Sequence, residues 1–265
     1  MKALQIMRTF VSGSTTGIPL VSMEPPLPDF LGLGTQKGGT TTLHWLLKQH
    51  QQVHLPDCKE VQYFTKHFDQ GELWYREHFG GATPQQRCGE ITPFYLFHPE
   101  APSRIHTLLP QAKLIVLLRD PVERAISQYF HSRKRGFETL ELGDAIAAEP
   151  SRLASRDPFS QQKHSYVSRS RYLEQLNRYE DLFHCDQLLI LRSEDLFEKM
   201  EWIWPRLLDF IGLEPKPVPA FVPQANAGSG DTRSVDPALR GRLQDQLRST
   251  VAGVRSRYGI EWSWS

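Results

Sequence analysis

Phe30-Leu-Gly-Leu-Gly34 is a short apolar run that ends in glycine, and it continues through Thr35-Gln36-Lys37-Gly38-Gly39 into Thr40-Thr41-Thr42-Leu43-His44-Trp45-Leu46-Leu47. The apolar positions of the last segment recur at helical spacing, and threonines suit a helix start. The stretch therefore predicts a strand, a glycine-rich loop and a helix. Such a loop offers backbone N–H groups and the positive end of a helix to an anion, and Lys37 adds a cation.

Further strands are predicted downstream of this loop. Lys113–Leu118 is an apolar run typical of a strand that is buried on both faces of a parallel sheet. Cys88–Ile91 and Gln187–Leu191 predict two more strands. Because these strands alternate with helical patterns, the sequence predicts an α/β fold, with a P-loop-like central parallel β-sheet flanked by helices on both faces. Ligands of such sheets bind beyond the carboxyl ends of the strands, where Lys37 and Arg119 both fall.

Several helices are predicted around these strands. One begins at Pro121, directly after Arg119-Asp120, because proline suits a first helical position. Others are predicted from Tyr172 to Phe183, from Ser193 towards Phe210, and from about Asp236 onwards. We expect the tail that contains Trp262 and Trp264 to pack back on the core.

The chain has 265 residues, a length that favours one compact domain. We predict a flexible N-terminal arm over 1–28 and a single domain over 29–265. The apolar stretches of the arm are too short for a signal peptide, and no later run approaches the roughly 20 apolar residues of a membrane helix. Three widely spaced cysteines indicate no disulfide framework, so we expect a reducing, cytoplasmic location.

Charge and metal-ligand patterns exclude other classes of partner. The chain has 31 basic and 30 acidic residues, so a net charge of +1 provides no long-range field for a nucleic acid. His50 and His54 could share a helix face, but no third ligand is indicated, and we predict no metal site. A small-molecule, glycan or lipid acceptor is the expected partner, and the oligomeric state is left open.

The glycine-rich loop departs from the common nucleotide fingerprints. Lys37 precedes Gly38-Gly39, whereas a Walker A loop ends in Gly-Lys-Ser/Thr, and the glycine spacing is not GxGxxG. These differences disfavour an ordinary kinase or dehydrogenase.

Two segments resemble a known family. Leu33–Leu43 resembles the 5′-phosphosulfate loop of sulfotransferases that use 3′-phosphoadenosine 5′-phosphosulfate (PAPS), especially the heparan sulfate sulfotransferase branch, in a soluble, bacterial-type form. Leu118–Tyr129 is similar to the 3′-phosphate segment of that family. The resemblance continues through Lys59–Phe64, Glu90–Tyr95 and Gln187–Leu196, so it covers most of the chain after residue 29.

The resemblance implies a PAPS-dependent sulfotransferase of the EC 2.8.2 class, which transfers a sulfuryl group to an acceptor hydroxyl or amine, releases adenosine 3′,5′-bisphosphate (PAP) and needs no metal. Lys37 is the expected catalytic cation, acting where charge grows in the transition state. Arg119 and Ser127 are expected to hold the 3′-phosphate. The complete set of expected donor-binding residues is Gln36, Lys37, Gly38, Gly39, Thr40, Thr41, Thr42, Arg119, Ser127, Gly230 and Arg233.

Glu60 matches the position of the general base in the heparan sulfate branch, which would take the acceptor proton. The alternative is that Glu60 forms a helix-cap contact or an ion pair with Lys59 or Lys66. Gln62 stands where a histidine is common in the family, which weakens any claim of identical proton handling. The residues expected to contact the acceptor are Glu60, Gln62, Glu90, Thr92 and Tyr95, the last three with a packing role as the alternative.

The acceptor itself is open among a carbohydrate, a lipid and another small alcohol. Ile91 stands where polysaccharide-acting relatives often carry a lysine, which disfavours a heavily sulfated glycan. Arg133-Lys134-Arg135 is either a solvated helix end or a patch that attracts an anionic acceptor.

Two alternative functions stay open. A P-loop kinase-like phosphotransferase would need a Walker-type lysine and a strand-terminal aspartate for magnesium, and Asp120 is the only strand-terminal candidate. A non-catalytic nucleotide-binding protein of the same fold is the other alternative.

Overall fold

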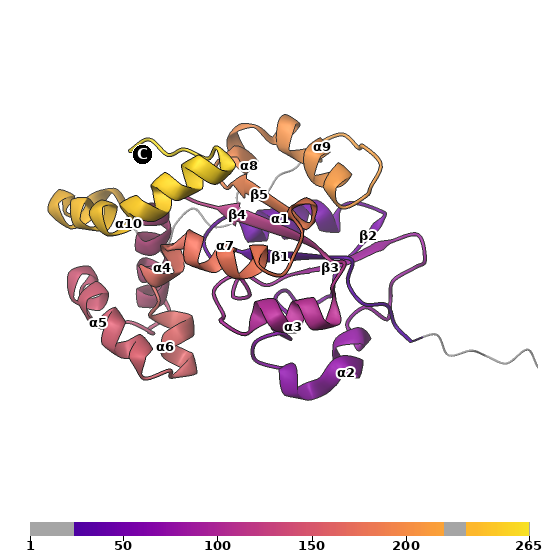
Figure 1. Cartoon of the computed structure of the whole chain (residues 1–265), viewed down its shortest axis with the longest axis horizontal. Helices are drawn as coiled ribbons and strands as arrows, with labels where there is room; N and C mark the ends of the chain where they lie inside the picture. The colour runs from indigo at the N-terminus through magenta and orange to yellow at the C-terminus, as the bar shows by residue number, and fades with distance from the viewer. Residues whose placement is uncertain (1–23, 220–231, 265) are drawn as a thin grey trace, which may run out of the picture.

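The computed structural model describes residues 24–219 and 232–264, and within them the chain forms a five-stranded parallel sheet in the order β2-β3-β1-β4-β5. Helices lie on both faces of this sheet (Figure 1). The predicted fold class is therefore confirmed. The strands are β1 (Phe30–Gly34), β2 (Val53–His54), β3 (Arg87–Ile91), β4 (Lys113–Leu118) and β5 (Leu188–Arg192).

The central strand β4 is apolar at nearly every position because it is covered on both faces. Successive side chains of a strand point to opposite sides of the sheet. Leu114, Val116 and Leu118 accordingly join one hydrophobic cluster, whereas Ile115 and Leu117 join another. The sheet therefore sits between two layers of helix and is well placed to hold its carboxyl-terminal loops rigidly.

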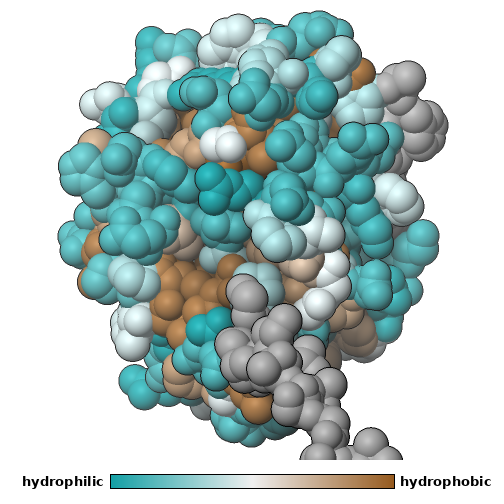
Figure 2. Space-filling model, turned by 90° about the vertical axis from the view of Figure 1, so that its right-hand side faces the viewer, coloured by the Kyte–Doolittle hydropathy of each residue, from teal (hydrophilic) through white to brown (hydrophobic). Residues whose placement is uncertain are grey.

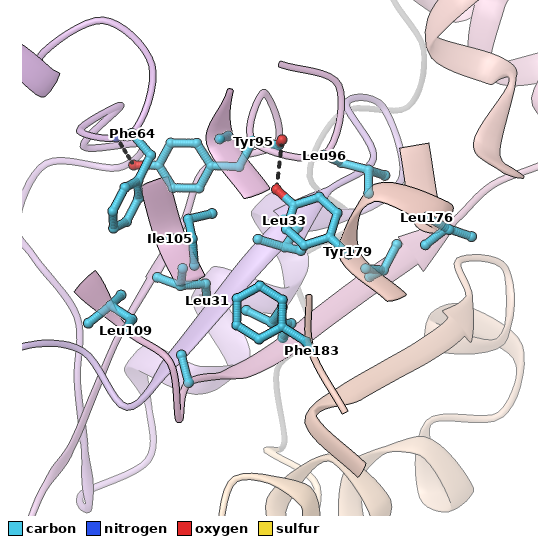
Figure 3. Close-up of a cluster of buried hydrophobic side chains, with 14 of the residues drawn as sticks. Leu31, Leu33, Phe64, Tyr95, Leu96, Ile105, Leu109, Leu176, Tyr179 and Phe183 are labelled. Atoms are coloured by element: carbon cyan, nitrogen blue, oxygen red, sulfur yellow. Dashed lines mark hydrogen bonds between the residues drawn. The ribbon is translucent and has the colours of Figure 1, made fainter. Parts of the chain in front are cut away.

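One layer contains α3 (Ala101–Leu108) and α7 (Tyr172–Glu180). Figure 3 shows the cluster beneath these helices, in which Tyr179 donates a hydrogen bond of 2.8 Å to the carbonyl of Tyr95. Trp262 is buried in the same cluster, which confirms that the C-terminal tail packs on the core.

The opposite layer contains α1 (Thr40–Lys48), α8 (Asp195–Glu198) and α9 (Met200–Phe210). The prediction of one continuous helix from Ser193 towards Phe210 is wrong. The backbone leaves the helical region at Lys199, with φ −138° and ψ 39°. This break separates α8, whose Phe197 lies beside Gly39 at the start of α1, from α9, which packs on the sheet.

The remaining helices surround the carboxyl end of the sheet and one edge. As predicted, α4 begins at Pro121 and α10 begins at Pro237, each after a capping aspartate. The helices of this group are α2 (Gly71–Glu77), α4 (Pro121–Lys134), α5 (Leu142–Ala154), α6 (Pro158–Lys163) and α10 (Pro237–Tyr258), and short 3-10 turns are η1 (Phe68–Gln70), η2 (Ser168–Ser170), η3 (Cys185–Gln187) and η4 (Thr232–Ser234).

The described part of the expected N-terminal arm packs on the domain. Pro28 is buried, and the carbonyl of Pro25 accepts a hydrogen bond of 2.9 Å from Arg76 of α2. Residues 24–28 of the predicted arm therefore include groups that contact the domain, and residues 1–23 lie outside the described residues.

Hydrophilic residues cover much of the face shown in Figure 2, with hydrophobic residues gathered in patches between them. Single exposed apolar side chains such as Trp45, Leu73 and Trp202 are ordinary on protein surfaces and identify no partner by themselves. Within residues 24–219 and 232–264, no helix combines the length and the apolar character that a membrane crossing requires.

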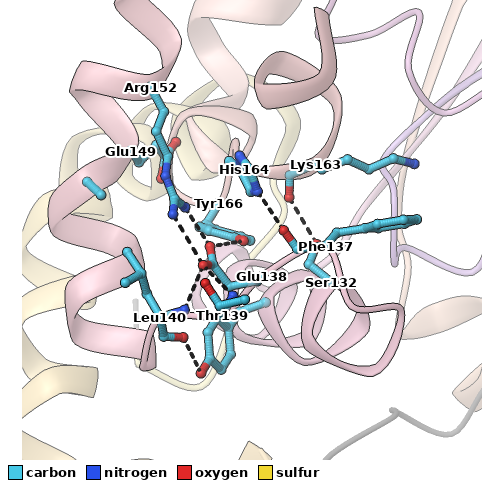
Figure 4. Close-up of polar contacts among 12 residues, drawn as sticks. Ser132, Phe137, Glu138, Thr139, Leu140, Glu149, Arg152, Lys163, His164 and Tyr166 are labelled. Carbon is cyan, nitrogen blue, oxygen red and sulfur yellow. Dashed lines mark hydrogen bonds and ion pairs between the residues drawn. The ribbon is translucent and has the colours of Figure 1, made fainter. Parts of the chain in front are cut away.

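A buried carboxylate ties α5 to the segment between α4 and α5 (Figure 4). Glu138 accepts hydrogen bonds from Arg152 at 2.6 Å, from the Tyr166 hydroxyl at 2.8 Å and from the backbone N–H groups of Thr139 and Leu140 at 2.9 Å each. Burial by itself raises the pKa of Glu138, but the hydrogen bonds from Arg152, Leu140 and Tyr166 outweigh burial and lower the pKa to about 2.

We predict that Glu138→Gln lowers the free energy of unfolding by about 3 kcal/mol at pH 7, since the pKa falls from an ordinary 4.5 to about 2 and each unit corresponds to roughly 1.4 kcal/mol. The folded-state pKa is depressed, so this stabilisation is present above pH 4.5 and is lost as the pH falls towards 2. Urea unfolding at several pH values measures it.

The control is Glu141→Gln, because the Glu141 side chain is exposed and pairs only with Arg133. A difference between wild type and Glu138→Gln that stayed constant from pH 6 to about pH 2.5 would contradict the assignment.

Candidate functional site

The loop between β1 and α1 is held by the neighbouring strand β4. Thr35 donates two hydrogen bonds to the carbonyl of Leu117, from its backbone N–H at 2.8 Å and from its hydroxyl at 3.0 Å. The hydroxyl of Ser193, which follows β5, donates to the carbonyl of Gly38 at 2.8 Å. The carboxyl ends of three adjacent strands therefore fix the loop.

Close packing and backbone conformation explain the glycines of this loop. A Cβ atom at Gly38 would lie 2.4 Å from the Thr35 hydroxyl and 2.9 Å from the carbonyl of Leu117. Lys37 and Gly39 have φ angles of 68° and 85°, in the left-handed region. Left-handed residues within such a loop form the concave arrangements of N–H groups that bind anions.

Arg119, at the end of β4, joins the loop directly. One guanidinium nitrogen of Arg119 donates a hydrogen bond of 3.1 Å to the backbone carbonyl of Lys37. Burial lowers the pKa of Lys37, and the positive charges of Arg119 and Lys134 lower it further. The structure thus brings the two predicted phosphate-binding segments into one cationic site.

Ser127 lies on α4 with only 1% of its surface exposed. Its hydroxyl has no hydrogen-bond partner within the described part of the chain. A buried polar group without a partner carries a desolvation cost of about 1–3 kcal/mol, so an orphaned hydroxyl indicates an absent acceptor. An oxygen of a phosphate group fits this position, because phosphate oxygens accept hydrogen bonds.

Asp120 has a structural role at the start of α4. One carboxylate oxygen accepts from the backbone N–H groups of Val122 and Glu123 at 2.9 and 3.0 Å, and the other accepts from the Trp264 indole at 2.6 Å. Both oxygens are therefore engaged by the helix terminus and the C-terminal tail. No group of three or more potential metal ligands occurs in the described ranges.

Glu60 lies in the loop after β2, with about a third of its side chain exposed. Lys59 donates to one carboxylate oxygen at 3.1 Å, so the ion pair considered as an alternative is present in the structure. Gln62 donates to the other oxygen at 3.3 Å. Glu60 and Gln62 both have φ angles near 60°, a left-handed conformation that costs energy for residues other than glycine and clusters at functional sites.

His131, on α4, is influenced by the charges of both Glu60 and Lys37. Burial lowers the pKa of His131, the charges of Lys37, Arg135 and Lys163 lower it further, and the charge of Glu60 opposes them. Lys37 and Glu60 thus both lie near one imidazole. His131 was not among the predicted site residues, although its position four residues after Ser127 on a helix places the two on the same face.

Glu90, Thr92 and Tyr95 are buried beneath the surface. Glu90 is 2% exposed and accepts hydrogen bonds from the hydroxyls of Tyr75 and Tyr95 at 2.7 Å and from Thr92 at 2.9 Å. The hydroxyl of Thr92 also accepts a long hydrogen bond of 3.4 Å from the backbone of Gln62. The three residues therefore support Gln62 from within the protein, and their predicted contact with an acceptor stays a prediction.

The other predicted donor-binding residues differ in exposure. Thr40 and Thr42 are buried, Thr41 is half-buried, and the half-buried Gln36 accepts a hydrogen bond of 2.6 Å from Arg169. Gly230 lies outside the described residues, as does the side chain of Arg233 in η4.

A separate cavity of about 600 Å³ opens at the other end of α1. It contains none of the predicted site residues and is therefore distinct from the candidate site. Its lining residues are Gln49, His50, Gln51, Gln52, Trp204, Glu214, Lys216, Pro217 and Pro219.

Comparisons with known proteins agree with this geometry. A family model described as a sulfotransferase domain matches residues 27–224. The chain belongs to the sulfotransferase family, as its two phosphate-binding segments predicted. The bacterial-type description within that family stays a prediction.

Two of the relatives are longer than this chain. Heparan sulfate glucosamine 3-O-sulfotransferase 6 of Mus musculus is 42% identical over 209 residues, which are 75% of this chain and 56% of the relative. The membrane-associated sulfotransferase kil1 of Dictyostelium discoideum is 44% identical over 120 residues, 44% of this chain and 26% of that protein. The chain thus spans between a quarter and just over half of the length of these two relatives.

A solved structure matches almost the whole chain. The sulfotransferase from Alicyclobacillus acidocaldarius aligns with a TM-score of 0.77 and 25% sequence identity, covering 90% of this chain and 98% of that one. The arrangement of sheet and helices is therefore that of a sulfotransferase.

We predict that Gly38→Ala destabilises the protein by about 1–3 kcal/mol, because a methyl group would overlap the Thr35 hydroxyl and the Leu117 carbonyl. Urea denaturation measures this loss. Gly143→Ala is the matched control, because no atom lies within 4 Å of the position that a Cβ would occupy there. Equal effects of the two substitutions would contradict the packing argument.

Proposed function

We propose that this protein transfers the sulfuryl group of PAPS to a hydroxyl or amine of an acceptor. The observation that carries the proposal is the joining of Arg119 to the Lys37 loop, together with a buried Ser127 hydroxyl that finds no hydrogen-bond partner among the described residues. These groups suit the two ends of one doubly phosphorylated adenosine. Membership of the sulfotransferase family supports the same donor.

The donor-binding residues divide by position. The backbone amides of residues 36–42 and the Lys37 ammonium would hold the 5′-phosphosulfate at the start of α1. Arg119 and Ser127 would hold the 3′-phosphate, with the guanidinium serving as a fork-shaped donor. Ser127 would then gain the hydrogen bond that it lacks.

When bound, PAPS supplies an activated sulfuryl group on a phosphate leaving group. Lys37 lies where it can stabilise the negative charge that grows on that leaving group during an in-line displacement. Burial lowers its pKa, and the nearby charges of Arg119 and Lys134 lower it further, so positive charge is concentrated in this region. The same field would stabilise the doubly phosphorylated product.

Glu60 is the proposed general base. A hydroxyl acceptor loses a proton as the new bond forms, and a carboxylate within hydrogen-bond reach can accept it. The partial exposure of Glu60 and its electrostatic proximity to His131, which Lys37 shares, support this role. Lys59 and Gln62 would orient the carboxylate through their contacts with its two oxygens.

Positive charge around Glu60 favours an acceptor that carries negative charge. Burial lowers the pKa of Lys163, the charges of Lys66, Arg169 and Arg135 lower it further, and Glu60 raises it. These cations supply positive charge. Ile91, which stands where relatives often carry a lysine, is buried against Gly32 and supplies none. We propose a carbohydrate hydroxyl as the first acceptor to test, since the name of the murine relative specifies a glucosamine of heparan sulfate; a lipid or another small alcohol follows.

The kinase-like alternative is disfavoured by Asp120, whose carboxylate caps α4 and accepts a hydrogen bond from Trp264, a structural role that differs from magnesium binding. A non-catalytic nucleotide-binding protein would retain the donor site without needing Glu60. The cytoplasmic location also stays a proposal, supported by the three free cysteines Cys58, Cys88 and Cys185.

We predict that PAP raises the melting temperature of the wild-type protein and that Arg119→Met or Ser127→Ala reduces this rise. At a ligand concentration 100 times the Kd, the stabilisation is about 2.7 kcal/mol. Differential scanning fluorimetry measures it, with ATP and magnesium as the comparison. A rise with ATP and magnesium but none with PAP would reject the sulfotransferase proposal in favour of a kinase.

We predict that Glu60→Gln lowers turnover with PAPS by about 100-fold or more while leaving the PAP-induced melting shift intact, because general-base catalysis contributes roughly 10²–10⁴-fold. Turnover is measured with labelled PAPS against a panel of sugars, lipids and phenols. Glu201→Gln, at an exposed position of α9, is the control. Undiminished turnover in Glu60→Gln would remove the base assignment.

A further inference from the structure

Arg169 is a buried cation without a counter-ion. It lies in η2, between α6 and α7, with 4% of its surface exposed. Within the described residues, no carboxylate forms an ion pair with it. Burying a charge without a partner is strongly unfavourable, so proteins retain such a group only where its hydrogen bonds compensate.

The contacts of Arg169 are with neutral groups from three separate elements. One terminal nitrogen donates to the side-chain oxygen of Gln36 at 2.6 Å, and the other donates to the carbonyls of Gln161 and Gln162 at 3.1 Å each. The guanidinium also lies over the rings of Phe94 and Phe97, 4.6 and 5.1 Å from their centroids. Arg169 therefore connects the glycine-rich loop to α6 and to the segment after β3.

The contact with Gln36 fixes the orientation of its amide. A glutamine amide carries an acceptor oxygen at one side and a donor NH₂ group at the other, whereas arginine has donors only. The oxygen of Gln36 must therefore face Arg169, and its NH₂ group must face away. Gln36 directly precedes Lys37, so this NH₂ group belongs to the loop proposed to hold the phosphosulfate.

We propose that Arg169 is a positioning residue that holds the Gln36 amide with its NH₂ group directed at the sulfuryl oxygens of PAPS. The inference rests on the proposed function and assigns a new specificity role within it. A flipped amide would present its oxygen to the sulfuryl oxygens and repel them. A charge-assisted hydrogen bond of this kind favours one orientation by roughly tenfold to a hundredfold.

The charge of Arg169 is retained at neutral pH. Burial and, to a smaller extent, the neighbouring charge of Arg124 lower its pKa to about 9, against the opposing effects of Glu60 and Glu149. Arg169 thus contributes a donor, and not an acceptor, to Gln36 throughout the physiological range.

The proposed role of Arg169 predicts different effects on the affinities for PAPS and PAP, which differ only in the sulfuryl group. PAPS carries the sulfuryl oxygens and PAP does not. Calorimetric titration of both nucleotides with wild type, Gln36→Leu, Arg169→Met and the double variant should show PAPS affinity falling about tenfold in each variant. PAP affinity should change by less than about twofold, and the double variant should be no worse than either single one.

Arg169→Lys should recover part of the PAPS affinity, because lysine retains a donor for Gln36. Arg171→Met is the matched control: this neighbouring arginine is 48% exposed and pairs with Glu174, so both affinities should stay unchanged. If Arg169→Met fails to fold, Gln36→Leu and Arg169→Lys still decide the question.

Equal losses of PAP and PAPS affinity, additive losses in the double variant, or no loss in Gln36→Leu would overturn the inference. Failure of the proposed function is a different result, because the wild-type protein would then bind neither nucleotide.

Discussion

The hydrogen bond between Arg119 and the backbone carbonyl of Lys37 is the contact on which the site depends. It joins the end of β4 to the loop after β1, two segments that are adjacent only because β1 and β4 are neighbours in the sheet. The Thr35 hydroxyl, which donates to Leu117, and the Ser193 hydroxyl, which donates to Gly38, also hold this loop against β4 and β5. The loop is therefore a rigid part of the sheet edge, which suits a site that must bind charge without rearranging.

The loops at the carboxyl ends of the strands combine uncommon backbone conformations with a buried polar hydroxyl. The left-handed Lys37, Glu60 and Gln62 are held in uncommon conformations, and the buried Ser127 hydroxyl has no hydrogen-bond partner in the part of the chain that the structure describes. Such features cost stability, and the two hydrophobic layers around β4 supply the packing that tolerates them. The buried cation Arg169 contacts the same glycine-rich loop through its hydrogen bond to the Gln36 side chain.

Much of the fold was predictable because its signals are local. The apolar run of β4 indicated burial on both faces, and proline at a first helical position indicated the start of α4. The helix break at Lys199 has no such local signal. The burial of Glu90 and of Arg169 was also hidden, because it depends on residues far away in the sequence, and nothing local distinguishes buried Arg169 from exposed Arg171. The identity of the glycine-rich loop, by contrast, was predicted from the resemblance of Leu33–Leu43 to the phosphosulfate loop of sulfotransferases.

The central claim is that one nucleotide spans Lys37, Arg119 and Ser127. A crystal structure of the protein grown with PAP tests it most directly. The account predicts an oxygen of the 3′-phosphate within hydrogen-bond distance of both the Ser127 hydroxyl and the Arg119 guanidinium, and the 5′-phosphate at the amides of residues 36–42. A nucleotide bound elsewhere, with the Ser127 hydroxyl still unpartnered, would contradict the account.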